Sequence, residues 1–328
     1  MTLHDSVAPR KHSRRGLYIP FLLLAVVIVA WTAAWFWLKG EAERRMDAGA
    51  AALREGGYTV SWSDRKLGGY PFRLDADFTD FRMAEPSGWG IAAPTLKAEA
   101  YIYALNHWVA YAPTGVTLNR PIGGPLLIDG QALRASVAGM DNDVPRLAVE
   151  GANLTFTPAP GAQDYLLQSA ERLNVAVRPG PDDQGAVLLN VTGAKAHLPG
   201  LLARVAADKP VDMDLEVILS KMSAFAGPNW RSMAQSWVAS GGEAQVRKAS
   251  LVAGGAELVA HGDRLTVGPD GRVQGKLDVD LRKAGDALSD MSGGAIPPEA
   301  GFGGATLTFS NGETTLGPLH IAPAPRLF

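Results

Sequence analysis

Apolar and polar side chains alternate with a period of two through most of the chain beyond residue 57. The clearest alternation covers five segments: residues 72–79, 96–103, 172–178, 211–220 and 276–281. Strands with one apolar side and one polar side are typical of antiparallel sheets that bury one face and expose the other to water. The pattern therefore predicts a mainly β domain, in which short helices are the exception.

Three segments have a helical rather than a strand-like pattern. They are residues 198–207, 228–240 and 281–291, while residues 293–304 are expected to form a loop. Together the three helices offer roughly 45 Å of length at about 1.5 Å per residue, which is too little to cover a sheet of ten or more strands spaced about 4.8 Å apart. We therefore expect a strongly bent antiparallel sheet, or a two-lobed β-sandwich-like domain that divides near residues 207–210. The residues expected to line an apolar groove on the inner face are Phe72, Leu74, Leu96, Ile102, Leu215 and Val217.

The N-terminal region has a different pattern. Residues 17–38 contain no charged side chain, and 22 residues give about 33 Å of helix, which is enough to cross the hydrocarbon core of a membrane. Trp31, Trp35 and Trp37 gather at the C-terminal end of this run, as in the aromatic belt of a membrane helix. A cleaved signal peptide is the alternative, because small residues follow Trp31, but the apolar run continues beyond them and favours a retained anchor.

A second helical pattern follows the apolar run, over residues 39–56. Ala42, Met46, Ala50 and Leu53 fall on one side of this helix, and the glycines at 56 and 57 end it. This juxtamembrane helix either extends the span and packs on the β domain or forms a solvated stalk.

Charge is distributed unevenly along the chain. Residues 1–38 carry four basic side chains and Asp5, a net of +3, so the remaining 27 basic and 32 acidic residues give −5. A basic N-terminal flank remains in the cytoplasm, so we expect residues 1–16 to be a cytoplasmic tail and residues 57–328 to lie on the other side of the membrane. The acidic balance of the domain argues against nucleic acid as a partner.

The sequence contains no recognisable catalytic or metal-binding motif. It has no cysteine, its six histidines are scattered, and it lacks the Gly-x-Ser-x-Gly turn of many hydrolases. Asp212, Asp214 and Glu216 share one side of a predicted strand and are interpreted as a solvated face rather than a cation site. We expect no cofactor, no metal and no enzymatic activity. The sequence also contains two groups of aromatic residues, each of which either lines a cavity or belongs to the core. The first consists of Tyr101, Tyr103, Trp108 and Tyr111, and the second of Trp230 and Trp237.

Three short motifs lie between residues 56 and 112. They are Gly69-Tyr70-Pro71-Phe72-Arg73-Leu74, Gly88-Trp89-Gly90 and Asn106-His107. In this order, behind one apolar span and a short helix, they resemble the uncharacterised DUF2125 family of alphaproteobacterial membrane-anchored envelope proteins. The architecture is more distantly similar to the AsmA-type envelope proteins, which resemble lipid conduits and scaffolds. The resemblance implies that residues 57–328 form a periplasmic domain anchored in a bacterial inner membrane, but it implies no reaction. Gly69, Tyr70, Pro71, Trp89, Asn106 and His107 are interpreted as structural residues.

Three functions fit this description. A scaffold of the cell envelope that binds a lipid or another apolar ligand ranks first, because a bent sheet with one apolar face can hold an acyl chain. A protein-interaction scaffold in envelope assembly ranks second. An enzyme with an unrecognised site ranks third. The expected partners are the lipids of the inner membrane, an apolar ligand and other envelope proteins.

Overall fold

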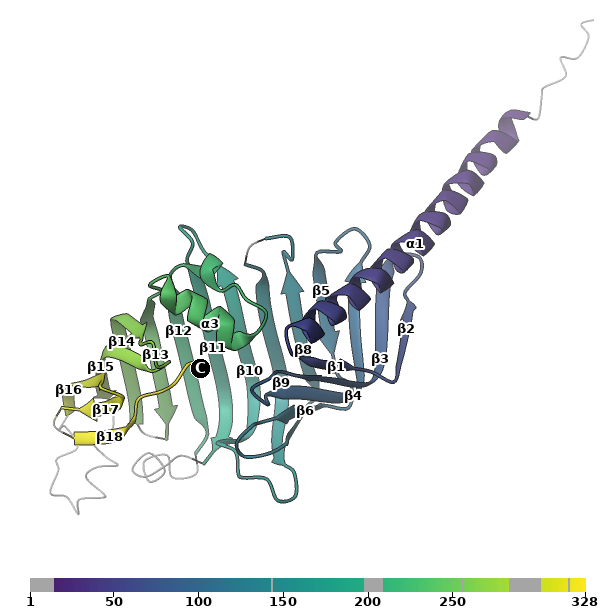
Figure 1. The fold of residues 1–328 in the computed structure, drawn as a ribbon. Helices are drawn as coiled ribbons and strands as arrows, with labels where there is room; N and C mark the ends of the chain where they lie inside the picture. The colour runs from purple at the N-terminus through teal and green to yellow at the C-terminus, as the bar shows by residue number, and fades with distance from the viewer. Residues whose placement is uncertain (1–14, 143, 198–208, 255, 283–301, 318) are drawn as a thin grey trace, which may run out of the picture.

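One long helix and one large antiparallel sheet make up most of the described part of the protein (Figure 1). The structure is a computed structural model that describes residues 15–142, 144–197, 209–254, 256–282, 302–317 and 319–328. The helix α1 (Arg15–Glu55) leads into the sheet, and a short 3₁₀ helix η1 (Met222–Ala224) and the helix α3 (Trp230–Ala239) interrupt it. The expectation of a mainly β fold with a strongly bent antiparallel sheet is confirmed.

The strands of the sheet follow one another along the chain. They are β1 (Thr59–Ser61), β2 (Asp64–Gly68), β3 (Arg73–Ala84), β4 (Gly90–Tyr101), β5 (His107–Tyr111), β6 (Val116–Asn119), β7 (Leu126–Asp129), β8 (Ala132–Ala138), β9 (Arg146–Pro158), β10 (Leu167–Pro179), β11 (Gly185–Ala196), β12 (Val211–Leu219), β13 (Ala244–Ala253), β14 (Ala256–Val267), β15 (Val273–Arg282), β16 (Phe302–Ser310), β17 (Glu313–Leu316) and β18 (Leu319–Pro323).

The two halves of the sheet are built differently. In the first half, two pairs of short strands lie between the long strands β4 and β9. β4 pairs with β5 near one of its ends and with β6 near the other. These pairs rejoin the sheet at β9, through β8 and β7 respectively. From β9 to β18 each described strand pairs with the next one in the chain, including β11 with β12 across residues 207–210. The described strands on both sides of that position therefore belong to one sheet.

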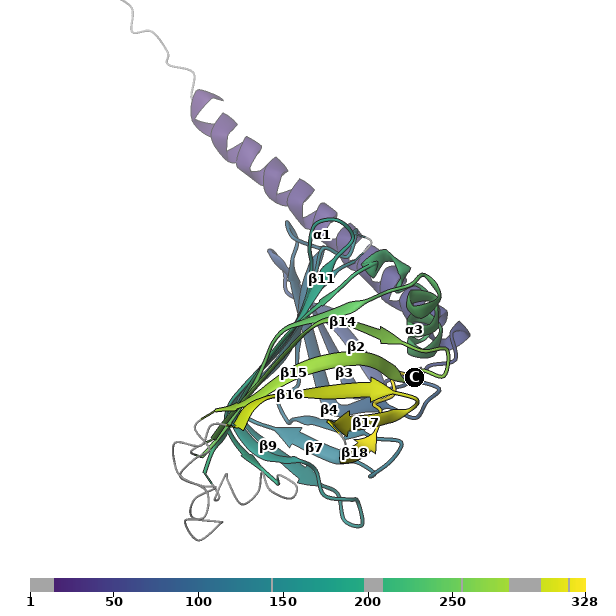
Figure 2. The same ribbon diagram turned by 90° about the vertical axis from the view of Figure 1, so that its left-hand side faces the viewer.

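The strands bend strongly across their length (Figure 2). Register shifts interrupt β11 between Val191 and Ala194, β12 and β13 beside Val217, and β14 between His261 and Leu265. Irregularities of this kind bend a strand and increase its twist. As a result the sheet is concave on one side, and α1 and α3 both lie on that side (Figure 2).

The best-packed core lies beyond these bends, at the end of the sheet where β7, β9 and β10 meet. Leu126 and Leu154 are almost completely buried there, together with Phe156, Val191 and Val211. The folded-over strands bury one another's apolar side chains, so this end of the domain is a conventional closed core.

The predicted span and juxtamembrane helix form a single helix, which passes through Gly40 without a break. The helix ends at the predicted glycines, where Gly57 has a positive φ of 91°. The predicted helix at residues 228–240 is confirmed as α3, with Asn229 as its N-terminal cap. The predicted helix at 198–207 and most of that at 281–291 lie outside the described residues. The predicted loop at 293–304 is wrong at its end, because β16 begins at Phe302.

Candidate functional site

The strands align their apolar side chains into a continuous row across the concave face. Cross-strand partners follow one another from β3 to β13 through the antiparallel ladder. This apolar row consists of Ala76, Ala98, Ala110, Ala135, Val149, Val175, Leu189, Leu215 and Ala249. Because side chains directly opposite each other share one face of a sheet, the row forms the floor of a trough.

The neighbouring positions on the same strands form an equally continuous row on the opposite face. This polar row consists of Asp77, Lys97, Tyr111, Arg134, Glu150, Asn174, Asn190, Asp214 and Ser250. Lys97 forms an ion pair with Asp77 at 3.0 Å, and Arg134 forms one with Glu150. Asn190 donates a hydrogen bond to Asp214 at 2.6 Å, which with Lys248 lowers the pKa of that carboxyl below its ordinary value.

Four of the predicted groove residues lie within the trough strands. Leu74 pairs with Ala100, Leu96 with Phe78, Leu215 with Leu189, and Val217 with Val187. Phe72 and Ile102 lie just outside, where β3 begins and β4 ends, and the backbone N–H of Ile102 donates to the carbonyl of Phe72 at 3.1 Å. Phe72 is largely exposed, so it belongs to the rim of the trough rather than to its floor.

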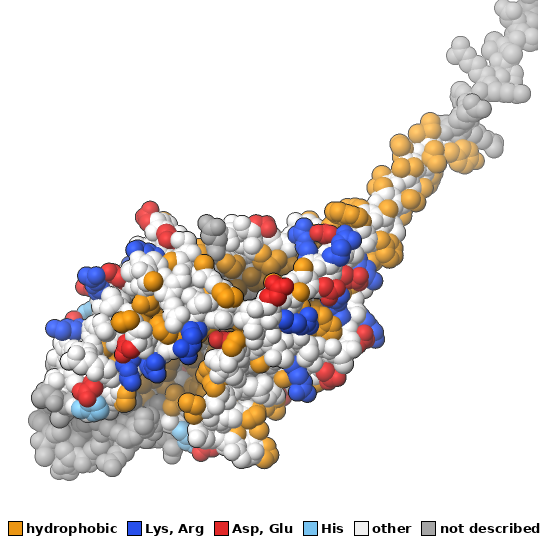
Figure 3. All heavy atoms as spheres, viewed as in Figure 1, with side chains coloured by type: hydrophobic (Ala, Val, Ile, Leu, Met, Phe, Trp, Pro, Cys, Tyr) orange, Lys and Arg blue, Asp and Glu red, His pale blue; other side chains and the backbone are white. Residues whose placement is uncertain are grey.

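The middle of the trough is open to solvent. Leu147 and Val149, on the concave side of β9, are 45% and 37% exposed although they are aliphatic. The space-filling view shows apolar side chains lining the hollow between α1 and α3 (Figure 3). An aliphatic surface that continues from a closed core into an open trough is typical of a binding surface rather than of a second core.

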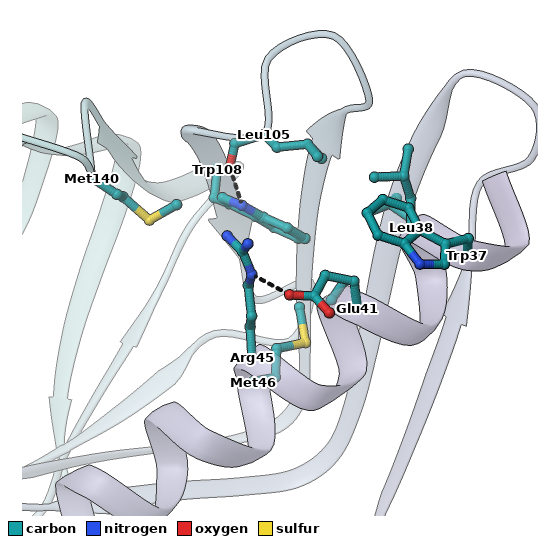
Figure 4. A pocket seen from close by; sticks show the side chains of 10 residues that line it. Trp37, Leu38, Glu41, Arg45, Met46, Leu105, Trp108 and Met140 are labelled. Atoms are coloured by element: carbon teal, nitrogen blue, oxygen red, sulfur yellow. Dashed lines mark hydrogen bonds and ion pairs between the residues drawn. The ribbon is translucent and has the colours of Figure 1, made fainter. Parts of the chain in front are cut away.

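A cavity of about 380 Å³ lies where α1 crosses the trough (Figure 4). The helix contributes Trp37, Leu38, Ala42 and Met46 to its lining, and the sheet contributes Leu74 and Trp108. Leu105 and Met140 complete the apolar part of the wall, and the ion-paired Glu41 and Arg45 provide the charged side chains. Its size falls within the range of small-molecule sites, and its lining suits an apolar ligand with a polar end.

The Gly69-Tyr70-Pro71 motif holds the helix against the domain. The indole N–H groups of Trp31 and Trp35 donate to the carbonyls of Pro71 and Arg73, at 3.0 and 2.9 Å. The Thr32 hydroxyl lies 2.9 Å from the Tyr70 hydroxyl. Trp35 is therefore buried against the β domain, which corrects its assignment to an aromatic belt at the membrane surface.

The turn that presents this motif depends on Gly69. Its φ is +96°, a conformation that side chains with a Cβ rarely adopt, and the Tyr70–Pro71 peptide bond is cis. A Cβ at position 69 would lie only 2.7 Å from the carbonyl oxygen of Arg73. Gly69 and Pro71 therefore have an identifiable structural role, because they form the turn against which α1 packs.

The other motif residues lie elsewhere on the domain. Trp89 is half exposed in the turn between β3 and β4, where its carbonyl accepts from the N–H of Glu85. Asn106 ends the turn before β5 and His107 is the first residue of that strand. The Asn106 carbonyl accepts from the N–H of Gly139, which joins the turns before β5 and after β8. These two turns contribute Leu105 and Met140 to the cavity wall.

Further contacts hold the C-terminal half of α1. Arg65 on β2 forms an ion pair with Asp47 at 2.6 Å, and Arg54 donates to the carbonyl of Val60 at 2.7 Å. The two arginines lie over the ring of Trp62, at 5.5 and 5.7 Å from its centre. These contacts contradict the solvated-stalk alternative for residues 39–56, because the helix is joined to the domain along this stretch.

The remaining candidates of the sequence are titratable side chains and two aromatic groups. No group of three or more His, Asp or Glu side chains there could hold a metal ion. Trp237 is buried and donates to the carbonyl of Ser220 at 2.7 Å, so it belongs to the core beneath α3. Trp108 contributes to the cavity, whereas Tyr101 and Tyr103 stack on each other in the open.

Comparison with protein families identifies a match over residues 35–325. The matching family is described as an uncharacterised protein conserved in bacteria, DUF2125. The chain belongs to this family. The match begins at Trp35, the helix residue that is buried against the domain, and it includes the docking motif and the whole trough. No curated protein and no solved structure matches the chain.

Within the described chain, α1 is the one helix long and apolar enough to cross a membrane. By length and composition it is compatible with either a single span or a signal sequence. Apolar side chains cover the visible side of the described part of its N-terminal half, and the charged side chains that are coloured on this helix lie where it reaches the sheet (Figure 3).

Proposed function

We propose that this DUF2125 protein is a single-span protein of the bacterial inner membrane whose periplasmic domain binds the acyl chain of a lipid or a similar apolar ligand in the trough. The observation that carries the proposal is the unbroken apolar row, which runs from Ala76, two residues along β3 from the cavity residue Leu74, to the exposed Val149 and on to Leu215. Transfer of an acyl chain from water onto such a surface is favourable by about 0.8 kcal/mol for each buried CH₂ group.

The docking of α1 supports a retained anchor over a cleaved signal peptide. Cleavage after the small residues at 33 and 34 would remove Trp31 and Thr32 together with their bonds to Pro71 and Tyr70. It would also turn the buried Trp35 into a chain end. The basic flank of the span supports a cytoplasmic N-terminus. Alkaline phosphatase fused after Phe328 is therefore expected to be active, and an inactive fusion at normal expression would contradict the topology.

Lipid binding is tested most simply on the full chain purified from membranes. We expect mass spectrometry to detect a lipid at defined stoichiometry with the natural protein and much less with Val149→Glu, which places a charge on the trough floor. Glu150→Gln, on the other face of the same strand, is the matched control and is expected to retain the lipid. A chain without stoichiometric lipid, or equal retention by both variants, would refute the proposal.

A protein-interaction scaffold is the second candidate. It is favoured by the aromatic side chains exposed beside α1, which include Tyr70, Phe72 and Tyr103. Co-purification of one protein at a fixed ratio, lost on Tyr103→Ser and unaffected by Val149→Glu, would support this role.

A further inference from the structure

Five aromatic residues form a contiguous exposed surface where α1 meets the sheet. This aromatic patch consists of Trp31, Tyr70, Phe72, Tyr101 and Tyr103. The rings of Trp31 and Phe72 have centres 6.2 Å apart, and those of Tyr101 and Tyr103 stack at 5.1 Å. The hydrogen bond between Ile102 and Phe72 joins the two turns that carry the patch. Phe72 and Tyr103 are 61% and 78% exposed, so the patch presents large aromatic rings at the surface.

The length of α1 decides where this patch lies relative to a membrane. If the hydrocarbon ended before Trp31, the helix would cross it with residues 17–30 alone. Those residues extend about 21 Å, whereas the hydrocarbon core is about 30 Å thick. The residues after Trp31 must therefore also lie in the hydrocarbon core, and the run can extend as far as Leu38, before the charged Lys39.

The docked turn is carried into the membrane with the helix. Trp31 and Leu38 are separated by about 10 Å along the axis at about 1.5 Å per residue. Because Trp31 donates to the carbonyl of Pro71, the turn that contains Tyr70 and Phe72 lies at the depth of Trp31. This depth lies in the half of the hydrocarbon core nearer the β domain, which is about 15 Å thick, and transfer of an exposed aromatic ring from water into that half is favourable.

We infer that the aromatic patch is inserted into the periplasmic leaflet of the membrane, and that the cavity beside α1 consequently opens at the level of the lipid headgroups. The inference rests on the proposed membrane anchor and adds a source for the ligand, which is the leaflet itself. Trp37 and Leu38 line the cavity and also end the uncharged run, so one wall of the cavity continues directly into the membrane-spanning surface. An acyl chain can then enter the trough without crossing water.

Probes at single cysteines test the insertion, and the chain contains no native cysteine that would interfere. Phe72→Cys and Tyr103→Cys variants of the full chain are labelled with a nitrobenzoxadiazole dye and reconstituted into vesicles of phosphatidylethanolamine and phosphatidylglycerol. Ile122→Cys is the control, because Ile122 is 82% exposed but lies in the turn between β6 and β7 at the other end of the sheet. We expect blue-shifted emission and several-fold stronger quenching by lipids with doxyl groups at positions 72 and 103 than at position 122.

The outcomes separate the inference from the anchor on which it rests. Variants that remain in the membrane at alkaline pH while all three probes report water would overturn the insertion and leave the anchor intact. The same result is expected if the patch instead binds a second copy or a protein partner, because the vesicles contain lipid and one dilute protein. Release of the full chain at alkaline pH would overturn the anchor itself, and the insertion with it.

Discussion

Val149 and Glu150 are neighbours on β9, yet they belong to surfaces with opposite properties. Val149 lies in a row of alanine, valine and leucine side chains that crosses the concave face, and Glu150 in a row of charged and amide side chains that crosses the other. The polar row is held together by ion pairs and hydrogen bonds, whereas the middle of the apolar row is exposed to water. An exposed polar face needs no explanation in a water-soluble domain, but an exposed aliphatic face does.

The difference also separates two parts of the concave face itself. At the bent end Leu154 is 1% exposed and packed within a core, while Val149, on the same strand, is open. We therefore assign stability to the closed end of these strands, where Leu154 lies, and ligand binding to their open part, where Val149 lies.

The largest effect is expected at the closed end. Leu154→Ala removes a fully buried side chain and should reduce the free energy of unfolding by about 2–5 kcal/mol. Val149→Ala deletes an exposed side chain on the same strand and should reduce it by less than about 1 kcal/mol. Chemical denaturation of both variants measures the difference. Equal losses would mean that the trough is part of the core.

Gly69→Val is expected to have the next largest effect. The new Cβ would clash with the carbonyl of Arg73, and the φ of +96° is unfavourable for valine, so we expect a loss of about 1–3 kcal/mol. The turn precedes β3 and sets the register that places Leu74 on the concave face, and a shift by one residue would exchange the two faces. Gly68→Val is the matched control, since a Cβ there meets nothing within 4 Å. Normal stability of Gly69→Val with loss of function would instead indicate a site at the turn.

Leu215→Trp distinguishes an open trough from a filled one. Overpacking of a closed core reduces stability by about 1–3 kcal/mol. In the open trough we expect a smaller change in the melting temperature, together with weaker uptake of a fluorescent fatty acid. A large loss of stability, with no fatty-acid binding by the natural protein, would exclude the binding role.

Much of this division could be predicted from the sequence, because the period of two shows which side chains share a face. The alternation in residues 72–79 and 211–220 correctly predicted β3 and β12 and placed Leu74 and Leu215 on the apolar side. The short strands β5 to β8 were not predicted individually, because four to seven residues hold too little pattern.

The docking of α1 was beyond the reach of pattern analysis. Trp31 and Trp35 are tryptophans at the end of an apolar run, as in the aromatic belt of a membrane helix. Their hydrogen bonds to the carbonyls of Pro71 and Arg73 join residues about forty positions apart in the sequence. Side-chain bonds to backbone carbonyls leave no signature in the acceptor residue, since every residue has a carbonyl. The end of the predicted loop at 293–304 is wrong for a local reason, because the glycines beside Phe302 favour a turn in the sequence, whereas Phe302 and Ala305 pair with β15 in the structure.

The smallest effect is expected on the polar face, at Asp214. Its pKa is lowered mainly by the hydrogen bond from Asn190 and also by Lys248. The resulting stabilisation is fully present above the ordinary pKa of 3.8 and is lost as the pH falls through the lower folded value. Asp214→Asn should therefore reduce stability at neutral pH by a few tenths of a kcal/mol, because the pair is partly exposed. The deficit should shrink in acid, and a deficit that grows in acid would contradict the assignment.

Photocrosslinking from the two faces of β9 tests the central claim most directly. Benzoylphenylalanine is placed at position 149 or at position 150 of the full chain in its native membrane, and the irradiated protein is analysed by intact mass spectrometry. Both native side chains are at least one-third exposed, so each position tolerates the larger group. The account predicts an adduct with the mass of a lipid at position 149 and none at position 150. Lipid adducts of equal yield at both positions, or none at 149, would contradict it.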